Sequence, residues 1–499
     1  AEASGLYELP ADAPVGQNIR DYLNLDDTVF EIKLTPNRAD CLSLHGVARD
    51  VAALTGSALN NIAVKPVAAS IADVLPTRID APAACGRFVG RVVKNLNAAA
   101  PTPAWMVQRL ERAGLRPISA LVDITNYVML HLGQPMHVYD LAKINGTLHV
   151  RFAKNGERIK LLNEQTHELQ DDVLVIADDN GAIGLAGVMG GDSTKAELNT
   201  TDIFLEAAFF APAVIQGKSR RFRFSSDASH RFERGVDFMG QIEAAEFATQ
   251  LVLDICGGEV GPVSELIGEL PVREQLSMRV ARAQKVIGVD IPTDDMVKYL
   301  SDLQLDVTRT SDAARGEVLS VTAPSYRFDM AIEEDLIEEV VRLFGYDNIP
   351  LRPPVATMTM LHAPEAVRAA DVVRDTLVAL DYQEVVNFSF IDAALETEFA
   401  GTDSAPIQLL NPIASSLSVM RTQLVGSLLG NLKTNLARSQ NRVRVFELAK
   451  VFLRDASVTA SDATVPNINQ PLKLAGLAYG STQPEQWSET LRAVDFYDV

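Results

Sequence analysis

One carboxylate interrupts a strongly apolar segment near the middle of the chain. Residues 203–210 read IFLEAAFF, a near-continuous apolar run that predicts a buried strand with Glu206 inside it. Burying a carboxylate is costly unless a partner or a polar cavity receives it. The residues alone leave two interpretations open: Glu206 pairs with a nearby arginine in the core, or it lines a pocket.

The segment that follows this strand is rich in basic and small residues. Residues 218–235 read KSRRFRFSSDASHRFERG. A basic loop beside a recessed carboxylate suits a substrate that has an anionic backbone and a small polar group to be recognised. The alternative is a solvated charged loop in front of a helix, and it would prevail if this loop were the only signal.

A second group of carboxylates is spaced to share one face of a helix. Asp335, Glu338 and Glu339 follow the spacing i, i+3, i+4, and Asp329 stands in the loop that enters the helix. The other face should be buried and carries Ile332, Leu336, Val340, Leu343 and Phe344. A hard divalent cation would relieve the repulsion among four converging carboxylates, and Mg²⁺ is favoured over Ca²⁺ because no EF-hand pattern is present. A solvated acidic face is the alternative.

Composition narrows the class of protein. The chain has 499 residues, 47% of them hydrophobic, which suggests three or four domains with large cores. No apolar run approaches the roughly 20 residues that a membrane span needs. The net charge of −20 argues against a protein that coats nucleic acid non-specifically. Cys41, Cys85 and Cys256 are isolated, so neither a zinc site nor a disulfide framework is supported, and a reducing cytoplasm is expected.

Periodic patterns predict the elements that must position these residues. A strand is expected at 29–34, and a helix at 43–56. The core stripe of this helix would be Leu44, Val47, Val51 and Leu54. Residues 134–140 are interpreted as a loop with an isolated histidine, and the glycine run at 181–191 as a tight strand–turn segment where the backbone approaches another group closely. Further helices are expected at 102–114, 119–133, 238–256, 332–344, 367–380 and 424–437.

Five long motifs, in order along the chain, resemble one known family. They are TPNRADCLSLHGVARD (35–50), LVDITNYVMLHLGQPMHVYD (121–140), SSDASHRFERGVD (225–237), APSYRFDMAIEEDLIEEVVRLFGYDNIP (323–350) and NRVRVFELAKVF (441–452). Together they resemble the β subunit of bacterial phenylalanyl-tRNA synthetase over essentially the whole chain. The family's N-terminal OB-type module and C-terminal anticodon-binding module have no counterpart here. The chain begins at Ala1 without a Met, and it is interpreted as the middle of a longer polypeptide.

The resemblance implies an α+β multidomain fold. Residues 1–75 would be a remnant of the N-terminal module with a connector, and residues 76–265 a mixed α/β editing domain. Residues 266–350 would form a small, winged-helix-like helix–strand module with the acidic, magnesium-binding helix. Residues 351–499 would form a degenerate class II synthetase core with an antiparallel sheet that has lost catalysis.

The resemblance also implies an activity, partners and site residues. The family's editing domain hydrolyses tyrosine wrongly attached to tRNA(Phe), and its α subunit charges tRNA(Phe) with ATP in a cytoplasmic (αβ)₂ heterotetramer, with neither membrane nor DNA as a partner. Position by position, the editing pocket carries over to Glu206, His137, Gly190, Ser226, Ala228 and, less securely, Asn126. Ser226 stands where the family has threonine and keeps the hydroxyl. The magnesium site, near the α interface, carries over to Asp329, Asp335, Glu338 and Glu339.

Editing suits the chemistry of phenylalanine and tyrosine, which differ by one hydroxyl. An apolar pocket rejects an added hydroxyl only weakly, whereas a site that hydrogen-bonds the hydroxyl discriminates strongly. We expect Glu206 to accept the tyrosine hydroxyl, His137 and the 226–228 loop to position the ester, amides near Gly190 to polarise its carbonyl, and a positioned water to attack.

Two other readings stay open. One is a scaffold subunit without editing, because Arg444-Val445-Phe446-Glu447 has the wrong spacing for a working class II site. The other is a Mg²⁺-dependent hydrolase that uses the acidic cluster.

Overall fold

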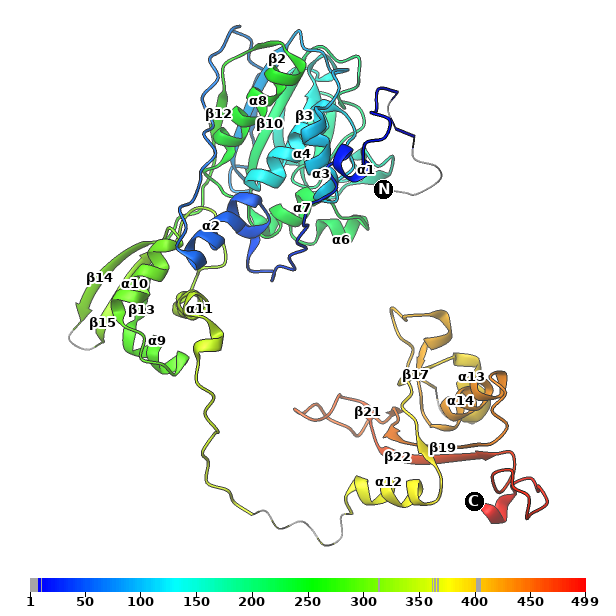
Figure 1. Ribbon diagram of the computed structural model, residues 1–499. Coiled ribbons are helices and arrows are strands. Elements are labelled where there is room, and N and C mark those ends of the chain that lie inside the picture. Colours follow the sequence, from blue (N-terminus) through cyan, green and yellow to red (C-terminus); the bar gives the residue numbers. More distant parts are fainter. Residues whose placement is uncertain are drawn as a thin grey trace. The chain divides into compact units, whose positions relative to one another are not determined.

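Two compact units, Ala1–Pro353 and Pro354–Val499, make up the chain in a computed structural model (Figure 1). The structure describes residues 8–9, 11–312, 315–360, 362, 365, 368–400 and 405–499. Among the described helices, none has both the length and the apolar character needed to cross a membrane. Glu206 lies in the first unit.

The predicted buried strand is β10 (Ile203–Phe210), the middle of the central sheet. It pairs antiparallel with β2 (Cys85–Lys94) on one side and β3 (Met136–Asp140) on the other, and β11 (Glu259–Val260) and β12 (Ser264–Ile267) pair with β2. Every residue of β10 is buried, as expected for a strand covered on both faces. The expected loop at 134–140 is wrong from Met136 onward, because this segment hydrogen-bonds to β10 as a strand.

Helices and a second sheet cover opposite faces of the central sheet. The helices α4 (Ala120–Leu132) and α8 (Gln241–Cys256) pack on the face that carries Leu205 (Figure 1). The face that carries Phe204 packs against a second sheet. In order, the strands of this sheet are β1 (Thr77–Ile79), β4 (Leu148–Phe152), β7 (Leu174–Asp178), β8 (Gly181–Leu185) and β9 (Met189–Gly190). Because side chains alternate along a strand, Glu206 shares the face of Phe204 and lies between the two sheets.

Shorter elements complete this part of the unit. They are α3 (Ala104–Arg112), the hairpin β5 (Arg158–Lys160) and β6 (Thr166–Glu168), and the helices α5 (Pro212–Ile215), α6 (Lys218–Phe222) and α7 (Asp227–Phe232). The helices expected at 102–114 and 119–133 are therefore found as α3 and α4. The basic segment 218–235 was expected as a loop, but it forms α6 and α7.

Two expectations near the N-terminus are wrong. Residues 29–34 form no strand, since no described backbone pairs with them, and Phe30 is 81% exposed. The helix α2 (Leu44–Thr55) exists, but its expected core stripe faces solvent: Leu44, Val51 and Leu54 are exposed. The helix instead packs closely against the turn that precedes it: a Cβ on Gly46 would lie 1.8 Å from the Asp40 carbonyl oxygen. Periodicity shows that a helix has an apolar face but not which surface covers it.

A small helix–strand module ends the first unit. Its sheet has the order β13 (Gln275–Arg279), β15 (Gly316–Thr322), β14 (Asp306–Asp312) and is antiparallel. The helices α9 (Val280–Ile287), α10 (Thr293–Asp302) and α11 (Glu333–Phe344) share one apolar core with it. The predicted acidic helix is thus α11.

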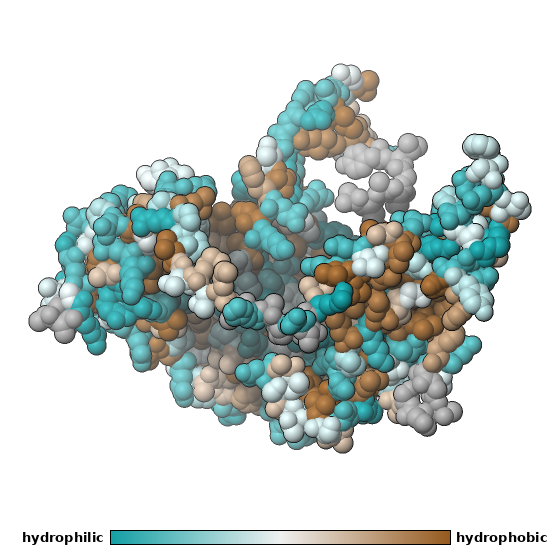
Figure 2. All heavy atoms as spheres, turned by 90° about the horizontal axis from the view of Figure 1, so that it is seen from below, coloured by the Kyte–Doolittle hydropathy of each residue, from teal (hydrophilic) through white to brown (hydrophobic). Residues whose placement is uncertain are grey.

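The second unit centres on a three-stranded sheet. Its order is β16 (Gln383–Glu384), β19 (Val443–Lys450), β22 (Leu472–Tyr479), beside the helices α12 (Ala370–Ala379), α13 (Ala393–Ala400) and α14 (Val425–Ala437). The sheet is mixed rather than antiparallel, because β16 pairs with β19 in parallel. The predicted start of α12, residue 367, lies outside the described residues. In the view of Figure 2, apolar side chains gather on the visible face of this unit. Leu472 and Leu474 of β22 are exposed.

Candidate functional site

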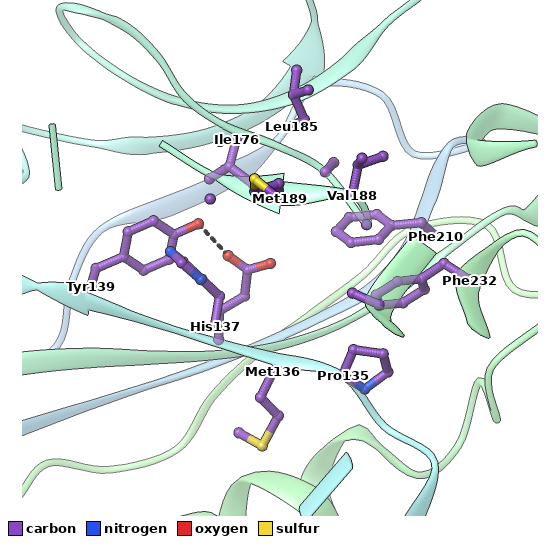
Figure 3. A pocket seen from close by; sticks show the side chains of 16 residues that line it. Pro135, Met136, His137, Tyr139, Ile176, Leu185, Val188, Met189, Phe210 and Phe232 are labelled. Carbon is purple, nitrogen blue, oxygen red and sulfur yellow. Dashed lines mark hydrogen bonds between the residues drawn. The ribbon is translucent and has the colours of Figure 1, made fainter. Parts of the chain in front are cut away.

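A small pocket lies between the two sheets of the first unit. Its cavity volume is about 110 Å³, and its walls are mostly apolar, with Phe210 and Phe232 on one side (Figure 3). Three polar side chains line it: Glu206, His137 and Tyr139. An apolar pocket with a few polar groups is the usual form of a small-ligand site.

Glu206 is held in this pocket by a tyrosine rather than an arginine. The register of β10 sets Glu206 opposite His137 on β3, and its side chain is almost fully buried. The Tyr139 hydroxyl donates a 2.6 Å hydrogen bond to Glu206 Oε2. Burial raises the pKa of the Glu206 carboxyl to about 7, although the bond from Tyr139 opposes the rise. Glu206 is therefore a buried acid that titrates near neutral pH.

His137 is neutral and has a free ring nitrogen. Burial lowers its pKa to about 4, because a charged imidazole loses hydration there. Its ring stands edge-on to Tyr139, with centroids 4.4 Å apart. Within the described residues, its Nε2 is buried and makes no hydrogen bond. Such an atom is free to bind a polar group of a ligand.

Gly190 makes room for the histidine ring. A Cβ on Gly190 would lie 2.2 Å from Cε1 and 2.5 Å from Nε2 of His137. The glycine run was expected to bring the backbone close to another group, and that group is His137 on β3.

Replacing Gly190 with alanine should displace the histidine ring. We expect an at least tenfold loss of any activity that uses the pocket, because misplacing a reacting group by about 1 Å can cost about a hundredfold. Gly184→Ala is the matched control, since a Cβ at Gly184 in the same wall would meet its neighbours at 3.7 Å or more. Equal loss in both variants would show that the approach to His137 is unimportant.

The helix α7 closes the pocket through its first turn. The Ser226 hydroxyl caps α7 by accepting from the Ser229 amide at 3.0 Å, and it donates to the Val188 carbonyl oxygen at 2.6 Å. Ala228 lines the pocket, whereas Ser226 is not among its lining residues. Ser226 therefore joins α7 to the turn before β9, and its proton is already engaged.

Asn126 is not brought together with the other predicted residues. It lies half-buried on α4 and is not among the lining residues of the pocket. The helix packs on the Leu205 face of the central sheet, whereas Glu206 lies on the opposite face. Conversely, Tyr139 was missed because its segment was interpreted as a loop. The signal that could have found it is the strand alternation shared with His137, two residues earlier.

A basic hollow lies on the other side of α7. Its volume is about 1040 Å³, and Arg220, Arg223, Arg234 and Phe224 are among its lining residues. Among the described residues, the side chains of Arg220 and Arg223 have no ion-pair partner, while Arg234 pairs with Glu233. Ala228 of α7 lines the pocket, and Ser225 and Glu233, which flank α7, line the hollow, so a chain lying in this hollow could reach the pocket past one short helix.

The acidic residues of the small module contact arginines instead of converging. Arg327, which is 2% exposed, bonds Asp329 at 2.9 and 2.8 Å and Glu339 at 3.0 Å. The Asp335 carboxylate accepts from two backbone amides at the start of α11, and Glu338 is exposed.

Burial along this helix differs in part from the predicted pattern. Leu336 and Val340 are buried as predicted, but Ile332 is 56% exposed, and Glu339 is buried because Arg327 and Arg342 receive it inside. No group of three or more His, Cys, Asp or Glu in the described residues is arranged to hold a metal ion. In this arrangement the four predicted ligands do not fit one Mg²⁺, and arginines relieve their repulsion.

Comparisons with known proteins find matches along most of the chain. Three family models match: the B3/4 domain at residues 84–257, the tRNA synthetase B5 domain at 276–346 and the phenylalanyl tRNA synthetase beta chain CLM domain at 349–499. Proteins named phenylalanine–tRNA ligase beta subunit from Cupriavidus pinatubonensis and Burkholderia pseudomallei are 56% and 54% identical over 99% of this chain. The relative from Chromobacterium violaceum is 53% identical over 100% of it.

The matches leave part of each relative uncovered. The chain spans 60 to 62% of the length of these relatives. A crystal structure of an N-terminal fragment of the phenylalanyl-tRNA synthetase beta-subunit from Pyrococcus horikoshii is similar over 66% of this chain and 95% of that one, with 15% identity. Its TM-score of 0.32 is too low to establish a shared fold.

Proposed function

Because the chain belongs to the family of phenylalanine–tRNA ligase β subunits, we propose that it supports charging of tRNA(Phe) by an α subunit and removes tyrosine wrongly attached to tRNA(Phe). ATP-dependent charging would belong to the α subunit, in a cytoplasmic (αβ)₂ heterotetramer. The hydrolytic site would be the pocket around Glu206. Exposed apolar side chains on the second unit support a protein partner, since large apolar patches commonly mark such contacts.

The observation that carries this proposal is the buried carboxylate of Glu206 in an apolar pocket. Phenylalanine and tyrosine differ by one hydroxyl, and Glu206 Oε1 receives no hydrogen bond from any described residue. A phenol that enters the pocket would donate to this oxygen, whereas a phenylalanine side chain would leave it unpaired. A site of this kind discriminates strongly.

Hydrolysis would then proceed by direct attack of water. The Ser226 proton is engaged with Val188, and the thiols Cys41, Cys85 and Cys256 are buried with raised pKa values, chiefly because of burial. Water adds to the ester carbonyl, the bond to the tRNA ribose oxygen breaks, and tyrosine and a free ribose hydroxyl are released. Neutral His137 would orient the ester through Nε2.

Deacylation of preformed Tyr-tRNA(Phe) by this chain in complex with an α subunit tests the proposal. We expect fast hydrolysis of Tyr-tRNA(Phe) and slow hydrolysis of Phe-tRNA(Phe). Hydrolysis of both at the buffer rate would refute editing and leave a scaffold subunit.

The second unit supports the alternative proposal, a scaffold subunit without catalysis of its own. On β19, Glu447 is buried against Arg421 at 2.8 Å, and Arg444 donates to backbone carbonyls at 3.1 and 3.3 Å. The Glu447 carboxylate is satisfied internally, so it is not presented to a substrate. No step of either proposal runs through Mg²⁺, because Arg327 bridges Asp329 and Glu339.

The basic hollow beside α7 supports a nucleic-acid substrate, because unpaired arginines attract phosphates. Replacing both Arg220 and Arg223 with alanine should weaken tRNA(Phe) binding and lower the slope of log K against log salt by about two. The matched control replaces Lys218 and Arg221 with alanine. It removes the same charge, but from two side chains that already pair with Asp172. Filter binding over a salt series measures both, and equal slopes in the two double variants would contradict this placement of the tRNA.

A further inference from the structure

Tyr139 occupies a position that core packing alone does not require to be polar. Its side chain is 1% exposed and belongs to the apolar core between the two sheets. Its hydroxyl nevertheless reaches the pocket and donates to Glu206 Oε2 at 2.6 Å. A phenylalanine would fill the same space without this bond.

The tyrosine ring is fixed independently of its bond to Glu206. His137 stands edge-on to it, with 4.4 Å between ring centroids (Figure 3). Phe204 packs against it with 6.4 Å between ring centroids. Gly184 lies close to the hydroxyl, since a Cβ there would be 3.7 Å from it. These contacts hold the ring in place, so the position of the hydroxyl that donates to Glu206 is set by the core.

We propose that Tyr139 is a positioning residue that orients the Glu206 carboxylate and leaves one oxygen, Oε1, as the acceptor for the substrate phenol. This inference rests on the proposed editing function. Oε2 of Glu206 accepts the hydrogen bond from Tyr139, and Oε1 faces the cavity. The selectivity of the pocket for tyrosine would then come from the pair Tyr139–Glu206 rather than from Glu206 alone.

The same bond also opposes the rise in the pKa of Glu206 that burial causes. The titratable groups that face Glu206 are Tyr139 and His137 on β3 and Cys85 on β2. His137 is neutral above pH 4, and burial raises the pKa of both Tyr139 and Cys85, so none of them carries charge at pH 7. The hydroxyl of Tyr139 is therefore the group that lowers the pKa of Glu206 against the effect of burial.

Tyr139→Phe removes the hydroxyl and keeps the ring. We expect kcat/KM for Tyr-tRNA(Phe) at pH 7 to fall about tenfold to a hundredfold, because a hydrogen bond to a charged group is lost. The rise of activity with pH should move to higher pH, and part of the rate should return there. Hydrolysis of Phe-tRNA(Phe) should stay unchanged. Tyr127→Phe is the control, since Tyr127 is also buried but bonds Arg109 on the other side of the central sheet.

The pKa of Glu206 is measured separately from activity. Infrared difference spectra against Glu206→Gln, over a pH series, follow its protonated carboxyl band in the wild-type and Tyr139→Phe complexes. If the wild type edits and Tyr139→Phe has the same pH profile and selectivity, Tyr139 has no positioning role. If the wild type does not edit, the proposed function fails, and an upward shift of the Glu206 pKa in Tyr139→Phe supports the control by Tyr139, while an unchanged pKa overturns it.

Discussion

Glu206→Ala is expected to reduce hydrolysis of Tyr-tRNA(Phe) by at least about a hundredfold while charging with phenylalanine continues. The variant removes the acceptor for the phenol and leaves the apolar walls of the pocket in place. A site that loses the group that reads a hydroxyl loses most of its discrimination. Single-turnover deacylation and aminoacylation assays on one complex measure both activities. Unchanged clearance of tyrosine would remove Glu206 from the mechanism.

The pH dependence of the wild type follows from the raised pKa of Glu206. The carboxylate is the form that accepts a phenol proton, and it predominates above a pKa of about 7. Clearance should therefore rise as pH increases through 7 and level off above it, after correction for the spontaneous hydrolysis of the ester. A flat profile between pH 6 and 8 would contradict an ionised acceptor.

The free energy of unfolding should fall as pH rises and Glu206 ionises, whereas clearance of tyrosine should rise. The folded-state pKa is raised, so the native protein binds more protons than the unfolded chain between the two pKa values. The stability that protonated Glu206 provides is present below the unfolded pKa of about 4.3 and is lost as pH rises through about 7. Glu206→Gln should accordingly unfold at a higher temperature than the wild type at pH 8, with a smaller difference at pH 5.

Local patterns predicted the elements around the pocket better than the contacts between them. The apolar run at 203–210 predicts β10 correctly, and the glycine run predicts a close backbone approach that is realised at Gly190. The partner in that approach, His137, lies 53 positions earlier in the sequence and in the other sheet, and it is the packing of the two sheets that brings the two residues together. Tyr139 escaped prediction because the short segment that forms β3, Met136–Asp140, was interpreted as a loop despite its alternation.

The spacing of charged residues predicted less of the structure, because it does not show which residue each charged side chain contacts. The spacing of Asp335, Glu338 and Glu339 is consistent with a shared helical face, yet burial separates them. What decides their environment is Arg327, which lies 12 residues from Glu339 and contacts it only in the folded module. For the same reason, the apolar stripe of α2 could not reveal that its residues stay exposed.

Arg327→Ala is expected to destabilise the small module by about 3–5 kcal/mol. The side chains of Arg327, Asp329 and Glu339 are 2, 8 and 2% exposed, so the variant leaves Asp329 buried without a cation and Glu339 with Arg342 alone. Removing one partner of a buried ion pair costs far more than the pair itself contributes. Thermal or urea unfolding, followed by a probe within residues 276–346, measures the loss. A change below about 1 kcal/mol would show that water replaces the arginine at little cost.

The Arg327→Ala variant also tests whether a cation can take the place of the arginine. With Arg327 present, Mg²⁺ must compete with its guanidinium for Asp329 and Glu339, whereas in the variant Asp329 has lost its arginine and Glu339 keeps only Arg342, so an ion that prefers oxygen ligands can bind more readily. Ligands that bind only the native state raise its stability. Mg²⁺ should therefore stabilise Arg327→Ala more than the wild type, relative to NaCl of equal ionic strength. Equal or greater stabilisation of the wild type would mean that the ion binds these carboxylates despite Arg327, in an arrangement different from the one described.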